Sequence, residues 1–93
     1  MTGPLEFDFF EPYLEEPFQV EGGITLKLAE CKRLKSVPGQ PREPFSLLFR
    51  GPAAPMLPQK SYVLSHERSG PIEIFLVPVG QDAAGLMYEA VFN

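Results

Sequence analysis

The chain has few of the residues on which metal sites and disulfide-stapled domains depend. It has 93 residues, with one cysteine, Cys31, and one histidine, His66. A lone cysteine forms no internal disulfide, which excludes a small secreted scaffold held by disulfides. Metal sites need clustered ligands, and Cys31 and His66 lie far apart in the sequence. We therefore expect no metal site and no cofactor.

Basic residues are missing from one end of the chain. Residues 1–21 carry six acidic residues and no Lys or Arg, whereas the remainder carries all 8 basic residues and the other six acids, for a net charge of −4. Nucleic-acid binding requires a dense basic face, so no nucleic-acid partner is expected. The acidic end is either an ordinary solvated surface or one side of a complementary contact between copies or with a partner.

The chain also lacks a long apolar run. The longest apolar stretch, Ile72 to Val77, holds one polar residue and is too short to span a membrane. The N-terminus shows no basic region followed by an apolar run, as a signal peptide would have. We expect synthesis in the cytoplasm and no membrane partner, without assigning a final location.

Alternating apolar and polar residues predict an all-β fold. Hydrophobic residues make up 44% of the chain, and 11 prolines and 8 glycines divide it into short segments without a long helical period. Six strands are predicted, near residues 17–21, 24–32, 45–50, 60–66, 71–78 and 86–92. The expected product is a small antiparallel barrel or sandwich of about six strands. Exposed sheet edges would then be templates for strand addition by a partner.

The stretch Pro71–Val79 is predicted as an inner strand, covered on both faces along much of its length. Gly22-Gly23 predicts the turn of a hairpin between the first two strands. The strands near 60–66 and 71–78 should pair antiparallel. Loops are expected at residues 36–44, 51–58 and 80–85, where Pro and Gly gather.

Residues 1–16 form an acidic, aromatic N-terminal arm or edge segment, and residues 17–93 form a single β domain. The rings of this segment are the candidate interaction residues: Phe7, Phe9, Phe10 and Tyr13. Phe7 and Phe9 alternate with acids as in an edge strand, whereas the following residues fit a helical turn with Pro12 at its start. The rings either pack on their own domain or form an arm that docks on a neighbour.

No catalytic, cofactor-binding or metal-binding residues are assigned. Ser65, His66 and Glu67 hold the residue types of a catalytic triad, but consecutive strand residues point to opposite faces. His66 is expected to be an ordinary surface residue or a local cap. Cys31 precedes two basic residues that could lower its pKa, although a packed, unreactive cysteine is the favoured interpretation.

Arg50 is the candidate for a structural ion pair. It falls on the less apolar face of its predicted strand, beside apolar neighbours, and a partly buried guanidinium needs an anionic partner. Glu73 and Glu89 are the candidate partners, because both lie within predicted strands, and we expect Arg50 to pair with Glu89 across the sheet and fix its register.

Several runs carry a resemblance to a known family. They are Phe45-Ser-Leu-Leu-Phe-Arg-Gly-Pro52, Leu57-Pro-Gln59 with Tyr62 and His66, Gly70 through Ile74-Phe-Leu-Val-Pro-Val-Gly80, and Tyr88-Glu-Ala-Val-Phe-Asn93. Together they resemble a bacterial domain-of-unknown-function family of small β domains, often encoded near phage tail-collar or tail-fibre-like proteins. The resemblance covers about residues 17–93, and the acidic N-terminal stretch is less typical. It implies a structural or accessory role in a phage-tail-like assembly and supplies no catalytic residues.

The residues and the resemblance favour a non-enzymatic protein that acts through protein–protein contacts. The partner would be a second copy in a homo-oligomer, or a tail-fibre-like protein. The alternative is a β domain that binds a small ligand or a carbohydrate through exposed rings, with Phe10, Tyr13 and Tyr62 as candidates. An enzyme is the least favoured class.

Overall fold

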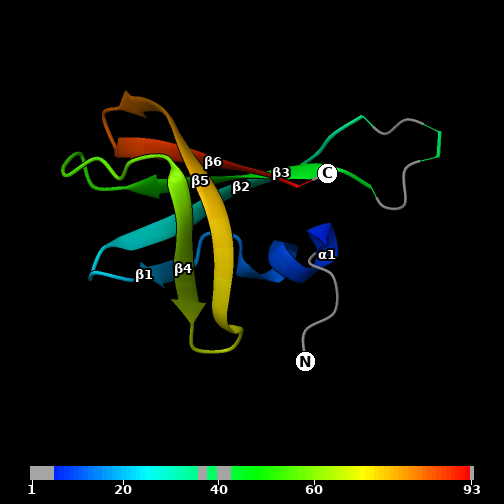
Figure 1. The fold of residues 1–93 in the computed structure, drawn as a ribbon, viewed down its shortest axis with the longest axis horizontal. Helices are drawn as coiled ribbons and strands as arrows, with labels where there is room; N and C mark the ends of the chain where they lie inside the picture. Colours follow the sequence, from blue (N-terminus) through cyan, green and yellow to red (C-terminus); the bar gives the residue numbers. More distant parts are fainter. Residues whose placement is uncertain (1–5, 36–37, 40–42, 93) are drawn as a thin grey trace.

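The computed structural model describes residues 6–35, 38–39 and 43–92, and in these ranges six antiparallel strands form a closed barrel in the order β1-β2-β3-β6-β5-β4 (Figure 1). The predicted all-β class is confirmed. The elements are α1 (Phe7–Phe10), the 3₁₀ helix η1 (Glu11–Tyr13), β1 (Pro17–Val20), β2 (Thr25–Arg33), β3 (Phe45–Gly51), β4 (Lys60–His66), β5 (Gly70–Asp82) and β6 (Gly85–Phe92). Residues 1–5 of the predicted arm, and residues 36–37 and 40–42 of the predicted loop, lie outside the described residues.

The predicted hairpin at Gly22-Gly23 is confirmed. Both glycines have positive φ, 98° and 101°, which side-chain-bearing residues rarely adopt. The turn brings β1 and β2 into register with Phe18 opposite Leu26, and both side chains point into the barrel. The predicted antiparallel pairing of β4 with β5 is also confirmed.

Closure of the barrel limits one prediction and corrects another. Because β1 pairs with β4, no described strand is an edge along its whole length, and unpaired stretches that strand addition could use remain at residues 70–76 of β5 and 90–92 of β6. A closed barrel also has one inner face, so β5 is covered on one side only. Ile72, Ile74 and Leu76 are buried, whereas Glu73 and Phe75 are exposed. The prediction that β5 is covered on both faces is wrong.

The loop predicted at residues 80–85 is also wrong, because β5 continues to Asp82 and β6 begins at Gly85. A register shift between Pro78 and Gly80 accommodates a proline within the strand. Gly85 has φ +133°, and a Cβ there would lie 2.0 Å from the Gly51 carbonyl oxygen, so only glycine fits this close approach.

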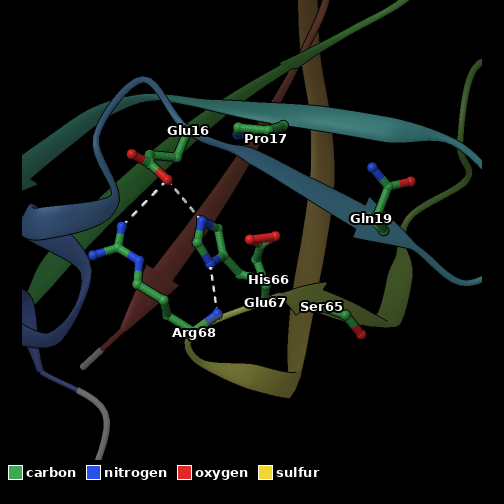
Figure 2. A pocket seen from close by; sticks show the side chains of 7 residues that line it. All are labelled: Glu16, Pro17, Gln19, Ser65, His66, Glu67 and Arg68. Atoms are coloured by element: carbon green, nitrogen blue, oxygen red, sulfur yellow. Dashed lines mark hydrogen bonds and ion pairs between the residues drawn. The ribbon is translucent and has the colours of Figure 1, made fainter.

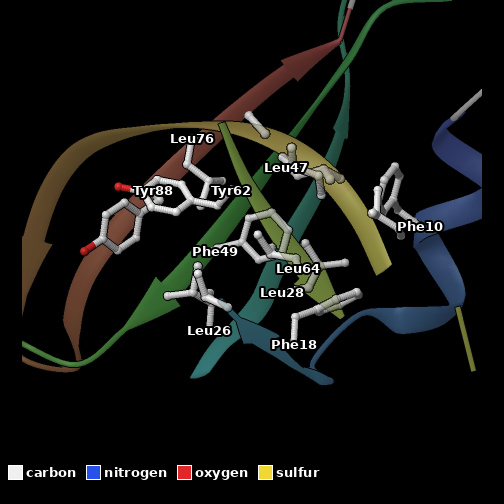
Figure 3. Packing of buried hydrophobic residues seen from close by; sticks show 14 of the residues in the cluster. Phe10, Phe18, Leu26, Leu28, Leu47, Phe49, Tyr62, Leu64, Leu76 and Tyr88 are labelled. Atoms are coloured by element: carbon white, nitrogen blue, oxygen red, sulfur yellow. The ribbon is translucent and has the colours of Figure 1, made fainter. Parts of the chain in front are cut away.

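The inward side chains form one hydrophobic core, part of which is shown in Figure 3. At one end the barrel is open, because β5 and β6 begin to pair only at Val77 and Glu89, while β6 stays paired with β3 as far as Phe92. Figure 1 shows α1 in the angle between the β4–β5 pair and the β2–β3–β6 strands. Phe10 from α1 is fully buried there. The N-terminal residues thus take the helical alternative and complete the core.

None of the helices in the described ranges combines the length and apolar character needed to cross a bilayer.

Candidate functional site

A pocket of about 770 Å³ lies at the seam where β1 meets β4 (Figure 2). Gln19 pairs with Ser65 across this seam. The residues that line the pocket are Glu16, Pro17, Gln19, Ser65, His66, Glu67 and Arg68. The lining is therefore polar and carries charges of both signs.

His66 is the buried centre of this pocket. Its Nδ1 accepts a hydrogen bond from the backbone N–H of Arg68 at 3.0 Å. Nδ1 is therefore the unprotonated nitrogen, and Nε2 carries the proton and donates to Glu16 Oε1 at 2.7 Å. The expected local cap is confirmed, whereas the expected surface position is wrong because only 9% of His66 is exposed.

Aromatic rings surround the imidazole. The Tyr13 and Phe18 ring centroids lie 4.7 Å and 5.3 Å from that of His66. The Arg68 guanidinium lies 4.9 Å from the Tyr13 ring centroid and 3.3 Å from Glu16 Oε1. Four segments of the chain, η1, the start of β1, the end of β4 and the following turn, are thus joined at one point.

The Glu16 carboxylate is held in its charged form. The hydrogen bond from His66, followed by the charge and hydrogen bond of Arg68, outweighs partial desolvation and lowers the pKa of Glu16 below its ordinary value. Both ring nitrogens of His66 have partners, and Figure 2 shows the Ser65 hydroxyl directed away from the imidazole. His66 thus links Glu16 to the backbone of Arg68, and this geometry does not activate Ser65 as a nucleophile.

The four candidate interaction rings all contact their own barrel. Phe7 meets Phe45 edge-on at 6.2 Å, and Phe10 lies 5.9 Å from Phe45 and 5.5 Å from Phe92. Phe9 and Tyr13 are half-buried against the same core. The structure therefore realises the alternative in which these rings pack on their own domain.

Three of the five acidic residues in residues 6–16 form ion pairs with basic residues of the same chain. Asp8 pairs with Arg33 at 3.4 Å and Glu15 pairs with Lys27 at 3.1 Å. Glu16 pairs with Arg68 as described above. Part of the complementarity between the acidic end and the basic remainder is thus used between segments of one molecule.

Arg50 forms its ion pair with Asp82, not with Glu89. Its guanidinium lies 2.8 Å from Asp82 Oδ2. In the β3–β6 register Met87 lies opposite Arg50, whereas Glu89 lies opposite Leu48. The Arg50 guanidinium instead contacts Asp82 at the end of β5. Asp82 was not among the predicted partners, because residues 80–85 were predicted as a loop.

Asp82 also organises its own turn. Its Oδ1 accepts a hydrogen bond from the backbone N–H of Ala84 at 2.9 Å. This hydrogen bond is the largest cause that lowers the pKa of Asp82, and the hydrogen bond and charge of Arg50 lower it further.

Cys31 is a packed cysteine. Burial, with a smaller contribution from the charge of Glu11, raises the pKa of its thiol to about 11. The raised pKa disfavours a thiolate, and Cys31 packs partly buried against the core, which agrees with the favoured interpretation of a packed cysteine. In the parts of the chain that the structure describes, no three His, Cys, Asp or Glu side chains gather to hold a metal ion.

Sequence reasoning missed a surface on the outside of the barrel. Large apolar side chains are exposed there: Phe75 (51%), Val79 (50%), Val91 (51%) and Val63 (36%). We call these four residues the outer apolar row. The pairing of Ser61 with Phe75 places Val63 diagonally next to Phe75 on the neighbouring strand. The sequence of β5 gave little signal for Phe75, because residues 72–77 hold only one polar residue, Glu73.

Comparison with known proteins identifies a family. No curated protein and no solved structure was found to match the chain. A family model described as Domain of unknown function (DUF6916) matches residues 5–92. This match includes α1 and η1, which the resemblance over residues 17–93 left out. The chain therefore belongs to the DUF6916 family of domains of unknown function.

Proposed function

We propose that this protein is a non-enzymatic structural or accessory protein that acts through protein–protein contacts, and that the outer apolar row is its contact surface. The observation that supports this proposal is the exposure of Phe75, Val79 and Val91, each about half exposed on the outside of the barrel. Val63 and Phe75 are diagonal neighbours on adjacent strands, and an exposed apolar patch on a small domain favours association with another protein.

The barrel presents this row on a rigid support. Phe75 lies in the middle of β5 and is held on one side by its pairing with Ser61 of β4, so little backbone freedom is lost when a partner covers it. A large ring at the centre of a contact, with polar residues around it, is the usual arrangement of a binding hot spot. Glu73 and the half-buried Glu89 supply this polar surround and favour a partner with basic groups around an apolar centre.

The setting we propose is a phage-tail-like assembly in a bacterium, with a tail-fibre-like protein or a second copy as the partner. The sequence resemblance supports this setting. The alternative of carbohydrate binding receives less support, because the described residues that line the seam pocket include no Phe, Tyr or Trp on which a sugar ring could stack.

Quantitative co-purification tests the proposal. A tagged Phe75→Ser/Val79→Ser variant should lose proteins that co-purify with the wild type from the source cells, because it removes apolar contact area without opening the core. The matched control is Lys32→Ser on the outside of β2, which is opposite β5 in the ring of strands. Equal recovery of the same proteins by all three chains would contradict the proposal.

A further inference from the structure

We propose that the open end of the barrel, which holds residues 6–13 of its own chain, also accepts these residues from a second copy, so that two chains exchange their N-terminal segments. We call residues 6–13 the plug, and we call the surface that they cover the acceptor cleft. This cleft is distinct from the outer apolar row, so the inference stands or falls independently of the proposed function.

Side chains make the contacts that hold the plug in the acceptor cleft. Phe10 packs against Phe45 and Phe92, which are themselves stacked at 4.6 Å with ring planes 6° apart. Arg33 pairs with Asp8 and lies 4.1 Å from the centroid of the Phe7 ring. The plug is therefore bound by rings and charges, as a short helical ligand is bound in a groove.

The backbone of the plug is largely self-contained. Its hydrogen bonds in the described residues run within the segment, for example from Phe9 N–H to the Glu6 carbonyl oxygen. Backbone hydrogen bonds to the barrel begin beyond the plug, where Glu15 N–H donates to the Leu28 carbonyl oxygen and Leu28 N–H donates to the Glu16 carbonyl oxygen. The plug can therefore leave as a unit without breaking the strand ladder.

The connection between plug and barrel is strained. Glu15 has φ +71°, the one positive value among the non-glycine residues that the structure describes. An L-residue with a side chain pays a steric penalty there. An extended hinge would release this strain while the plug entered the cleft of a second copy, which is the usual route to segment exchange.

A second copy is the occupant that fits the cleft best. Its plug carries the same rings and the same Asp8 carboxylate, so each contact with Phe45, Phe92 and Arg33 would be reproduced between chains. The contacts are equal in both arrangements. The balance between them is therefore set by the hinge and by protein concentration.

Hinge variants of the full chain test this inference. Glu15→Val keeps the backbone N–H that donates to the Leu28 carbonyl oxygen, but its β-branched side chain disfavours positive φ. Glu15→Gln is the matched control, because it also loses the ion pair with Lys27 but carries no β-branch. Glu15→Gly removes the steric penalty and should favour the closed monomer.

Light scattering and mixed-isotope NMR provide the readout. We expect Glu15→Val to have a dimer association constant about tenfold or more above that of Glu15→Gln, as relief of the strain predicts. Equal amounts of ¹³C-labelled and unlabelled chains, refolded together, should give Phe10–Phe92 NOEs between chains.

A folded Glu15→Val monomer would overturn the inference, as would a dimer with Phe10–Phe92 NOEs only within chains. If Glu15→Val does not fold, Glu15→Gln and Glu15→Gly decide. A higher dimer fraction for Glu15→Gln, with NOEs between chains, supports exchange, whereas equal fractions at the highest concentration overturn it.

Discussion

At the scale of single residues, Asp82 shows how one carboxylate can stabilise both a turn and a surface ion pair. One of its oxygens accepts from Ala84 N–H within the β5–β6 turn, and the other pairs with Arg50 on β3. The carboxylate thus connects the turn that joins β5 to β6 with the strand on the far side of β6.

Substitutions at Asp82 should separate these two contacts. Asp82→Asn keeps an oxygen that can accept from Ala84 but loses the charge opposite Arg50, whereas Asp82→Ala loses both. We expect Tm to fall in the order wild type, Asp82→Asn, Asp82→Ala, with a loss of a few degrees for the alanine variant in a thermal melt. An alanine variant as stable as the wild type would show that neither contact contributes.

Glu16 should make stability depend on acidity. Its pKa is below the ordinary value of 4.5 because His66 donates a hydrogen bond to it and Arg68 lies nearby. The folded state therefore binds this proton more weakly than the unfolded chain. The stabilisation by Glu16 is present above pH 4.5 and is lost as the pH falls below this value toward the folded-state pKa.

Glu16→Gln should therefore show a flatter loss of Tm than the wild type as the pH falls below 4.5. Glu67→Gln is the matched control, because it removes an exposed carboxylate of the same pocket. If the Glu16→Gln and wild-type curves of Tm against pH run parallel, the hydrogen bond from His66 does not hold Glu16 in its charged form.

At the scale of elements, α1 matters because it completes the core at the open end of the barrel. Phe10 is fully buried there, whereas its neighbour Phe9 is only half-buried. Phe10→Ala should lower the free energy of unfolding by about 3 kcal/mol, the lower end for a buried Phe-to-Ala change because an end site relaxes more easily. Urea unfolding measures this.

The control for Phe10→Ala is Phe9→Ala, which should cost clearly less. Equal and small losses for the two variants would mean that α1 does not belong to the cooperative core. An unchanged slope against urea concentration is expected for both, because the rest of the barrel unfolds as before.

β5 provides a second pair of neighbours with opposite environments. Ile74 is 2% exposed and points into the barrel, whereas Phe75 points outward. Ile74→Ala should lower the free energy of unfolding by about 2–4 kcal/mol, and Phe75→Ala by less than about 1 kcal/mol. Urea titration of both variants checks this, and a Phe75→Ala loss as large as that of Ile74→Ala would restore the prediction of a strand covered on both faces.

Local patterns predicted the elements of the barrel but not the way it closes. Alternation located the six strands within a few residues, and Gly22-Gly23 marked the first turn correctly. The continuation of β5 past Pro78 depends on a register shift against β6, which is a long-range feature. The burial of Phe10 likewise depends on Phe45 and Phe92, which are distant in sequence.

The candidate site was harder to predict for the same reason. His66 contacts Glu16, which lies 50 positions away along the chain, and single-sequence patterns do not report such a contact. Phe75 was missed because an apolar strand in a closed barrel must turn half of its side chains outward. The side that faces solvent becomes visible only when the ring of strands is known.

At the scale of the whole molecule, the charges favour contacts made by apolar groups. Arg33, Lys27 and Arg68 neutralise acids of the N-terminal segment within the chain. Association through the outer apolar row should therefore be insensitive to salt or strengthened by it, whereas docking between acidic and basic ends of different copies would weaken with salt.

Site-specific photo-crosslinking tests the outer apolar row most directly. A photoreactive phenylalanine analogue at Phe75, on the outside of β5, should crosslink to a protein from the source cells. The crosslink should form with similar yield when the sample is irradiated at high salt. The same analogue at Lys32, on the outside of β2, should not crosslink. Crosslinks of equal yield at both positions, or at Lys32 alone, would contradict a contact surface centred on Phe75.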